Sequence, residues 1–272
     1  MAQVINTNIA SLNAQRNLDT SQMSLRTSLQ RLSSGLRVNS ARDDAAGLGI
    51  AEKMSAQSRG MTVAARNAND GISLAQTAEG GLAVMGQHLQ RMRELATQAS
   101  SGQFDATNLS SLNQEFQALQ SEVQRIATAT TFNGKQVLGS DSTMSFQIGA
   151  NTSTDNQISV STVTGNFSAI VTSLAVSDTA GAIAAMVAID TAIDSTNTAR
   201  AGLGALQSRF EGVVTQLQTQ NENIQASRSR IMDTDYAAET ANMTRAQILQ
   251  QAGTAMLAQA NQLPQSVLTL LK

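Results

Sequence analysis

Apolar residues return at alternating spacings of three and four along the last third of the chain, from Met186 almost without interruption to Ala255. This heptad spacing is typical of a helix that packs along a narrow seam against partner helices. The first register consists of Met186, Ile189, Ile193, Leu203, Phe210, Val214, Leu217, Ile224 and Ile231. It slips by one residue at Ile231 and continues through Ala238, Ala241, Ile248, Ala252 and Ala255. The pattern predicts one helical rod on the order of 100 Å long, at ~1.5 Å per residue, whose narrow stripe needs partners.

The N-terminal part of the chain supplies a first partner for this rod. Its apolar stripe consists of Ile5, Ile9 and Leu12 and, after a change of register, Leu18, Leu25, Leu29, Leu32 and Leu36. A generic amphipathic helix packed on a globular core would show the same stripe. The residues that follow favour a helix pair, because Gly35 suits a helix C-cap and Asn39 a turn. Asp43 and Asp44 suit the first turn of a second helix, so we predict a hinge between two helices.

Two further helical segments and a small β region fill the middle of the chain. The apolar series over 82–99 and 109–126 are separated by a short turn, which predicts that these helices pack antiparallel. Asn133-Gly134 is a turn dipeptide, and apolar residues then alternate with polar ones, which predicts a β-hairpin region at about residues 140–165. The expected fold is mainly α: a long coiled-coil-like helical bundle built from both chain ends, with a small β-hairpin region in the middle.

The composition favours long helices and argues against nucleic-acid and membrane partners. Only 3% of the 272 residues are aromatic and the single proline lies near the C-terminus, which favours long helices over a globule. The net charge is −2 and no basic cluster stands out, so we expect no nucleic-acid partner. No stretch approaches the roughly 20 apolar residues of a membrane span, and the start lacks the features of a cleavable signal peptide. We therefore expect no membrane partner.

Residues that could take part in catalysis or bind a metal are few and scattered along the chain. His88 is the only histidine, so no histidine pair for a metal and no triad with a second histidine can form within the chain. Asp43 with Asp44, and Asp233 with Asp235, could suggest a cation site, but carboxylates at helix starts are the better interpretation. No phosphate-binding glycine loop is present. The sequence thus predicts no catalytic residue, no cofactor and no metal.

Several long strings resemble bacterial flagellin. They are RLSSGLRVNSARDDAAGLGIAEKM, NANDGISLAQTAEGGL, QRMRELATQA, FNGKQVL, FQIGAN and SRIMDTDYAAETANMTRAQILQQAGTAMLAQANQLPQSVLTLL. The resemblance covers nearly the whole chain. It implies the structural subunit of the flagellar filament, a self-assembling helical tube that is the propeller for swimming motility. Larger flagellins insert outer domains where this chain has only residues 165–182, so it resembles a minimal form.

The resemblance also implies how the chain is divided. Residues 1–40 and 229–272 correspond to the terminal coiled-coil domain that forms the inner core of the filament. Residues 41–228 correspond to the helical bundle domain of the outer core. An extracellular position in the filament then implies export through the flagellar type III channel, with both terminal segments largely disordered before assembly.

The resemblance finally implies partners and contact residues. Beside copies of itself, the chain is expected to meet the filament cap and hook-junction proteins, and an export chaperone at the C-terminal segment. A host Toll-like receptor is expected to contact the monomer at Arg91, Leu95 and Glu115, with Arg91 and Leu95 on one exposed face. The residues expected in the terminal coiled coil and in polymerisation are Ile5, Ile9, Leu12, Leu25, Leu29, Leu32, Leu36, Ile231, Ala238, Ala241, Ile248, Ala252 and Ala255.

Two alternatives belong to other classes of protein. A hook–filament junction protein would share related terminal helices, but it should diverge from the SSGLRVNSARDDAAG and QILQQAG…VLTLL strings, which are intact here. A coiled-coil signalling rod would need a membrane anchor or a hairpin tip with modification glutamates, and neither is seen. An enzyme fits the sequence least well.

Overall fold

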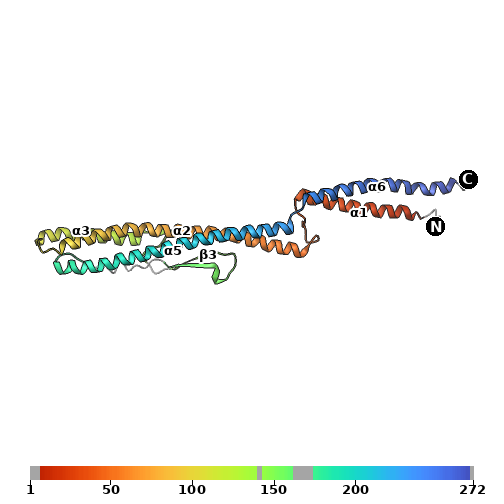
Figure 1. Ribbon diagram of the computed structural model, residues 1–272. Coiled ribbons are helices and arrows are strands. Elements are labelled where there is room, and N and C mark those ends of the chain that lie inside the picture. Colours follow the sequence, from red (N-terminus) through yellow and green to blue (C-terminus); the bar gives the residue numbers. More distant parts are fainter. Residues whose placement is uncertain (1–6, 140–142, 162–173, 270–272) are drawn as a thin grey trace. The chain divides into compact units, whose positions relative to one another are not determined.

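The computed structural model describes residues 7–139, 143–161 and 174–269, with side chains described as far as Gln262 (Figure 1). Its long helices are α1 (Ile9–Ser34), α2 (Ala45–Ala99), α3 (Ala106–Ala129), α5 (Thr179–Met232) and α6 (Tyr236–Thr269). Short strands lie between α3 and α5, so the predicted mainly α fold with a small β region is confirmed. The chain divides into two compact units, Met1–Ala56 with Asn223–Lys272, and Gln57–Glu222.

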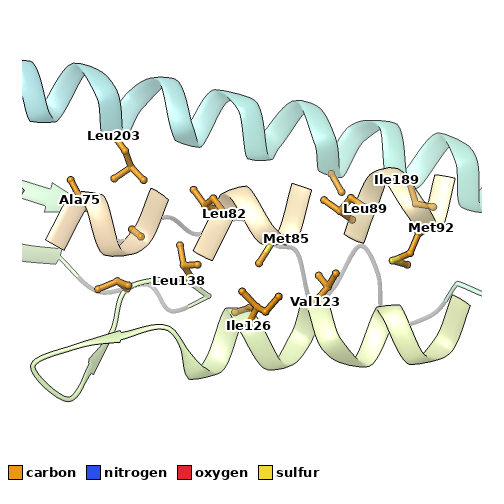
Figure 2. Packing of buried hydrophobic residues seen from close by; sticks show 14 of the residues in the cluster. Ala75, Leu82, Met85, Leu89, Met92, Val123, Ile126, Leu138, Ile189 and Leu203 are labelled. Carbon is orange, nitrogen blue, oxygen red and sulfur yellow. The ribbon is translucent and has the colours of Figure 1, made fainter. Parts of the chain in front are cut away.

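The unit Gln57–Glu222 is built around one face of α2. Leu82, Met85, Leu89 and Met92 are fully buried on α2, at the predicted spacings of three and four. Figure 2 shows these side chains between α3 and α5, which contribute Val123 and Ile126 from one side and Ile189 and Leu203 from the other. Because two helices cover α2, its buried stripe is wide, and neighbouring residues such as Leu95 and Ala96 are both buried.

Two antiparallel strand pairs follow α3. β1 (Thr131–Phe132) pairs with β2 (Lys135–Gln136) through Asn133 and Gly134, whose positive φ values of 49° and 75° are those of a tight two-residue hairpin turn. β3 (Thr143–Gln147) pairs with β4 (Gln157–Ser161), with Phe146 opposite Ile158. The short helix η1 (Thr154–Asn156) lies between them. The predicted turn dipeptide and the predicted hairpin region are both confirmed.

Phe210 links this hairpin to the helices. Its ring packs edge-on against Phe146 of β3, with ring centroids 5.7 Å apart. On the α2 side the ring rests against Gly71, where an added Cβ would lie 2.6 Å from the ring. Glycine at position 71 therefore creates the space that a fully buried aromatic ring needs between α2 and α5.

The C-terminal rod is broken, contrary to the predicted continuous helix. α5 ends at Met232 and α6 begins at Tyr236, because Asp235 accepts hydrogen bonds from the N–H groups of Ala237 (2.9 Å) and Ala238 (3.2 Å). A carboxylate in this position starts a new helix. The sequence does indicate this break, through the register slip at Ile231 and the two aspartates that follow it. The nearly continuous heptad pattern obscured both signals.

The N-terminal segment breaks next to this point. α1 ends as predicted at Gly35, which has φ 72° and donates its N–H to Arg31 O. Leu36 then forms an antiparallel bridge with Asp233, and Thr234 donates its N–H to Gly35 O over 3.0 Å. Val38, Ala51 and Met232 form a small buried cluster beside this bridge, with Leu36, Leu48 and Ile231 packed against it.

The two aspartates of the predicted hinge have separate roles. Asp44 precedes α2 and accepts a hydrogen bond from Gly47 N over 2.8 Å, so it is the N-cap and does not lie in the first turn as predicted. Asp43 closes the preceding turn, accepting hydrogen bonds from the Ser40 hydroxyl, Ser40 N and Asn39 N. These three donors lower the pKa of the Asp43 carboxyl, with the Ser40 hydroxyl as the largest cause.

We predict opposite effects of alanine at two glycines of α2. Gly71→Ala should lower the free energy of unfolding by about 1–3 kcal/mol, because the methyl group must displace the Phe210 ring. Gly80→Ala is the matched control, since an added Cβ there meets no atom within 4 Å, and should raise it by about 0.5–1 kcal/mol. Denaturant unfolding of the full chain, followed by circular dichroism, measures both. Equal effects of the two substitutions would contradict the packing described.

Candidate assembly surface

Helices α1 and α6 pack against each other in opposite directions (Figure 1). Asn8 at the start of α1 donates its amide to Ala260 O over 2.8 Å, and Arg31 at the other end lies 3.8 Å from Glu239. The less exposed positions recur at spacings of three and four on both helices. They are Ser11, Ala14, Leu18, Ser21, Leu25, Ser28 and Leu32 on α1, with Gln22 and Arg31 also half-buried beside them, and Glu239, Met243, Ala246, Gln250, Gly253, Leu257 and Ala260 on α6.

The most buried positions of this seam carry mostly small side chains. Its buried residues on the two helices are Ser11, Ser28, Ala246 and Ala260, together with Glu239. Gly253 lies against Leu18, where an added Cβ would be 3.3 Å from Leu18 Cδ1. Small residues bring the helices close together but bury little apolar area, so the pair gains little from the hydrophobic effect.

A charged pair and an unfilled groove lie in the same seam. Glu239 is only 7% exposed, and Arg31 is its cationic partner. Arg31 Nε is buried without a hydrogen-bond partner within the described residues. The groove beside the pair has a volume of about 520 Å³ and is lined by Thr20, Ser21, Met23, Ser24, Thr27, Ser28, Arg31, Glu239, Asn242, Arg245, Ala246 and Leu249. This part of the contact is polar and incompletely packed.

Other large apolar side chains of the two helices are exposed. Ile9, Leu12 and Met23 on α1 are half or more exposed, as are Ile248, Leu249 and Met256 on α6, with exposed fractions reaching 67% at Ile9. The helix pair thus leaves large apolar residues outside while its most buried positions are small or charged. Exposed apolar side chains of this size are typical of surfaces where other chains bind.

The expected coiled-coil residues divide between the two faces. Leu25 and Leu32 lie in the seam as predicted, and Leu36 and Ile231 pack beside the Val38 cluster. The remaining described positions are exposed: Ile9, Leu12, Leu29, Ala238, Ala241, Ile248, Ala252 and Ala255. Ile5 lies outside the described residues.

The expected stripe of α6 lies nearly opposite the observed seam. Ile248 is two residues from both Ala246 and Gln250, which is about half a turn at ~100° per residue. The sequence pattern follows the largest apolar residues, whereas the two helices pack through Gly253, Ala246 and the charged Glu239. The exposed set therefore lies outside the α1–α6 seam of one chain, and its part in the terminal coiled coil and in polymerisation stays a prediction.

The three residues expected at a receptor contact do not share one exposed face. Arg91 and Glu115 are exposed and bonded to each other, because Arg91 Nε and Nη2 donate to Glu115 Oε1 over 3.0 and 2.9 Å. Glu94 accepts a further bond from Arg91, and the hydrogen bonds to Glu94 and then Glu115 raise the pKa of Arg91. Leu95 is 1% exposed and belongs to the core. The expected exposed face of Arg91 and Leu95 is wrong, because α2 is covered by two helices and its buried stripe is wider than a single seam.

The described part of the chain contains no group of three His, Asp or Glu side chains that could hold a metal ion. Within the same residues, no helix combines the length and apolar character needed to span a bilayer. The described residues form a mainly helical protein with a packed bundle and a terminal helix pair that leaves large apolar side chains exposed.

Comparison with known proteins gives the family. The model of the bacterial flagellin N-terminal helical region matches residues 5–143, and that of the C-terminal helical region matches residues 186–271. A flagellin of Halalkalibacterium halodurans is 45% identical over 99% of this chain and 100% of its own length. A flagellin of Bacillus subtilis is 41% identical over 98% and 99%. A crystal structure of Bacillus cereus flagellin covers 60% of this chain and 94% of its own, with 28% identity and a TM-score of 0.50.

The chain belongs to the bacterial flagellin family. It is a structural subunit of the flagellar filament, a homopolymer that serves motility. These matches favour flagellin over the hook–filament junction protein and over the signalling rod.

Proposed function

We propose that the chain polymerises mainly through the outward faces of α1 and α6. Residues 1–40 and 229–272 then form the inner core of the filament, and residues 41–228 form the outer core. The observation that carries this proposal is the exposure of large apolar side chains such as Ile9 and Ile248, while the buried seam positions Ser28 and Ala246 are small. Other subunits are the partners that can cover both outward faces at once.

Energetics support assembly as the step that stabilises the terminal helices. Ordering a residue costs about 1–2 kcal/mol of conformational entropy, whereas buried apolar area returns only about 25 cal/mol per Å². A seam whose fully buried apolar positions are only Ala246 and Ala260, with its leucines half-buried, buries too little to offset that cost for two long helices. Neighbouring subunits that cover Ile9, Leu12, Ile248 and Leu249 add the missing area. Order in α1 and α6 therefore depends on subunit concentration.

The same outward face suits the partners of the unassembled subunit. An export chaperone that covers the C-terminal segment from about Ile231 would shield Ile248, Leu249 and Met256 until the chain reaches the growing tip. The filament cap and the hook-junction proteins are expected to meet the same terminal helices at the two ends of the polymer. Passage through the flagellar type III channel would give the extracellular position.

A charged substitution on the outward face tests the proposal. Ile248→Asp should slow elongation of preformed filament seeds at least tenfold, because an aspartate in an apolar contact costs more than about 1.4 kcal/mol. The isolated subunit should keep its helicity, since Ile248 is 60% exposed within one chain. Light scattering and electron microscopy measure the elongation, and circular dichroism measures the helicity.

Val187→Asp is the matched control for this experiment. Val187 is 66% exposed on α5, outside the terminal helix pair, so the same charge is added and apolar surface is likewise lost. This variant should elongate seeds at close to the wild-type rate. Wild-type elongation by Ile248→Asp, or equal inhibition by both variants, would contradict the proposal that the outward faces of α1 and α6 mediate polymerisation.

We further propose that a host Toll-like receptor contacts the monomer at Arg91 and Glu115. Both side chains are exposed and already held together, so they present one ordered polar feature on α2 and α3. Leu95 lies in the core, so a charged substitution there would test stability and recognition together. Leu95 is expected to take part only where binding uncovers it.

Replacement of the arginine separates recognition from folding. Arg91→Gln should lower receptor signalling by the monomer at least tenfold, the size of an interaction worth about 1.4 kcal/mol. Arg125→Gln is the control, because Arg125 is also an exposed arginine held by a carboxylate, that of Glu122. Reporter cells measure signalling, and thermal unfolding confirms the fold of both variants. Full signalling by a folded Arg91→Gln monomer would reject the contact.

A further inference from the structure

The methionines of the chain differ sharply in exposure. Within the described residues, four of them are buried and four are half-buried: Met61, Met85, Met92 and Met232, and Met54, Met144, Met186 and Met243. Met23 and Met256 are the two described methionines with highly exposed side chains, at 60% and 63%. One lies on α1 and the other on α6, the two helices that carry the outward apolar face.

Both exposed methionines belong to that face. Met23 follows Leu12 by eleven residues, about three helical turns, so the two side chains lie on one side of α1. Met23 also lines the groove beside the Arg31–Glu239 pair, together with Leu249 of α6. Met256 follows Leu249 by seven residues, or about two turns, and so lies on the same side of α6. A change of polarity at either sulfur alters the surface that a neighbouring subunit would cover.

We propose that Met23 and Met256 are a reversible oxidation site that switches polymerisation off, an inference that rests on the proposed assembly through α1 and α6. The oxidant class is a peroxide, for which hydrogen peroxide is the probe. A lone pair of the thioether sulfur attacks one peroxide oxygen, an S–O bond forms and the O–O bond breaks. The departing hydroxide takes the remaining proton and leaves as water. The sulfur is oxidised by two electrons to the sulfoxide, and the peroxide is reduced by two.

The location of the two sulfurs makes the modification selective. Peroxide must reach the sulfur, so Met61, Met85, Met92 and Met232 are protected by the fold of one chain. A sulfoxide is strongly polar, and a polar group placed in an apolar contact without a partner opposes association. Subunits in a filament would cover Met23 and Met256, so the free subunit is the sensitive form. Reduction of the sulfoxide would restore assembly.

The test uses the full chain as free subunit and as filament. Hydrogen peroxide is added to each, peptide mass spectrometry locates the sulfoxides, and the treated subunit is added to untreated seeds. Met23 and Met256 should oxidise faster than the buried Met61, Met85 and Met92 in the subunit, and at least tenfold more slowly in the filament than in the subunit. Each sulfoxide should raise the concentration needed for elongation about tenfold, equivalent to about 1.4 kcal/mol.

Two double variants separate this site from other methionines. Met23→Leu with Met256→Leu keeps the apolar surface without sulfur, and should elongate seeds normally before and after peroxide. Met54→Leu with Met144→Leu removes two half-buried sulfurs and should stay as sensitive as wild type. Incubating the oxidised wild-type subunit with methionine sulfoxide reductase should recover elongation.

The outcomes distinguish this inference from the function on which it rests. Untreated wild-type subunit that fails to elongate seeds would overturn the proposed function, and the oxidation switch with it. Untreated subunit that elongates while oxidised subunit does so equally well would overturn the switch alone. Equal loss of elongation by the oxidised Met23→Leu, Met256→Leu variant would also overturn it, since the sensitive sulfurs would then lie elsewhere.

Discussion

The structure depends on the mismatch between the two faces of the terminal helices. The most buried positions between α1 and α6 are Ser, Ala and one charged pair, with leucines and Met243 only half-buried beside them, whereas Ile9, Leu12 and Ile248 are exposed. Neither face favours a stable helix pair in isolation. The inner face buries little apolar area, and the outer face exposes large apolar side chains to solvent. In the assembly that we propose, other copies of the chain would supply most of the stability of its terminal helices.

The unit Gln57–Glu222 differs, because its large apolar side chains are buried within the unit. Its core on α2 is filled by Leu, Met and Phe side chains that are almost completely buried, and the Phe210 ring is accommodated by a glycine in the facing helix. Dense packing of this kind stabilises a bundle without help from neighbours. The division between a self-sufficient bundle and a dependent terminal pair lets one chain be stable before assembly and still respond to it.

Most of the fold could be predicted from the sequence because its signals are local. Gly35 as a C-cap, Asn133-Gly134 as a hairpin turn and the 82–99 stripe each depend on a few neighbouring residues, and each is confirmed. The break at Asp233–Asp235 was missed because a heptad count continues across a one-residue slip. In the structure, Asp235 instead caps the start of a new helix at this point. Leu95 was misplaced because periodicity in one helix cannot reveal that two helices cover it.

The assembly surface was predictable only in part, for a related reason. Apolar periodicity finds the large residues of α6, but which stripe faces α1 is decided by close packing at Gly253 and by the Arg31–Glu239 pair. These long-range partners are separated by more than two hundred residues, and their pairing leaves no local pattern. The family resemblance pointed to the two terminal segments, while the structure was needed to separate the buried seam of their helices from the exposed side.

Hydrogen exchange of the full chain, as free subunit and as filament, measures whether neighbouring subunits stabilise α1 and α6. Amides of α1 and α6 should exchange fast in the free subunit and become protected in the filament. Amides of α2 over Leu82–Ala99 should be protected in both states, because their core is complete within one chain. Protection of α1 and α6 in the free subunit equal to that of α2 would contradict the claim that neighbouring subunits stabilise the terminal helices.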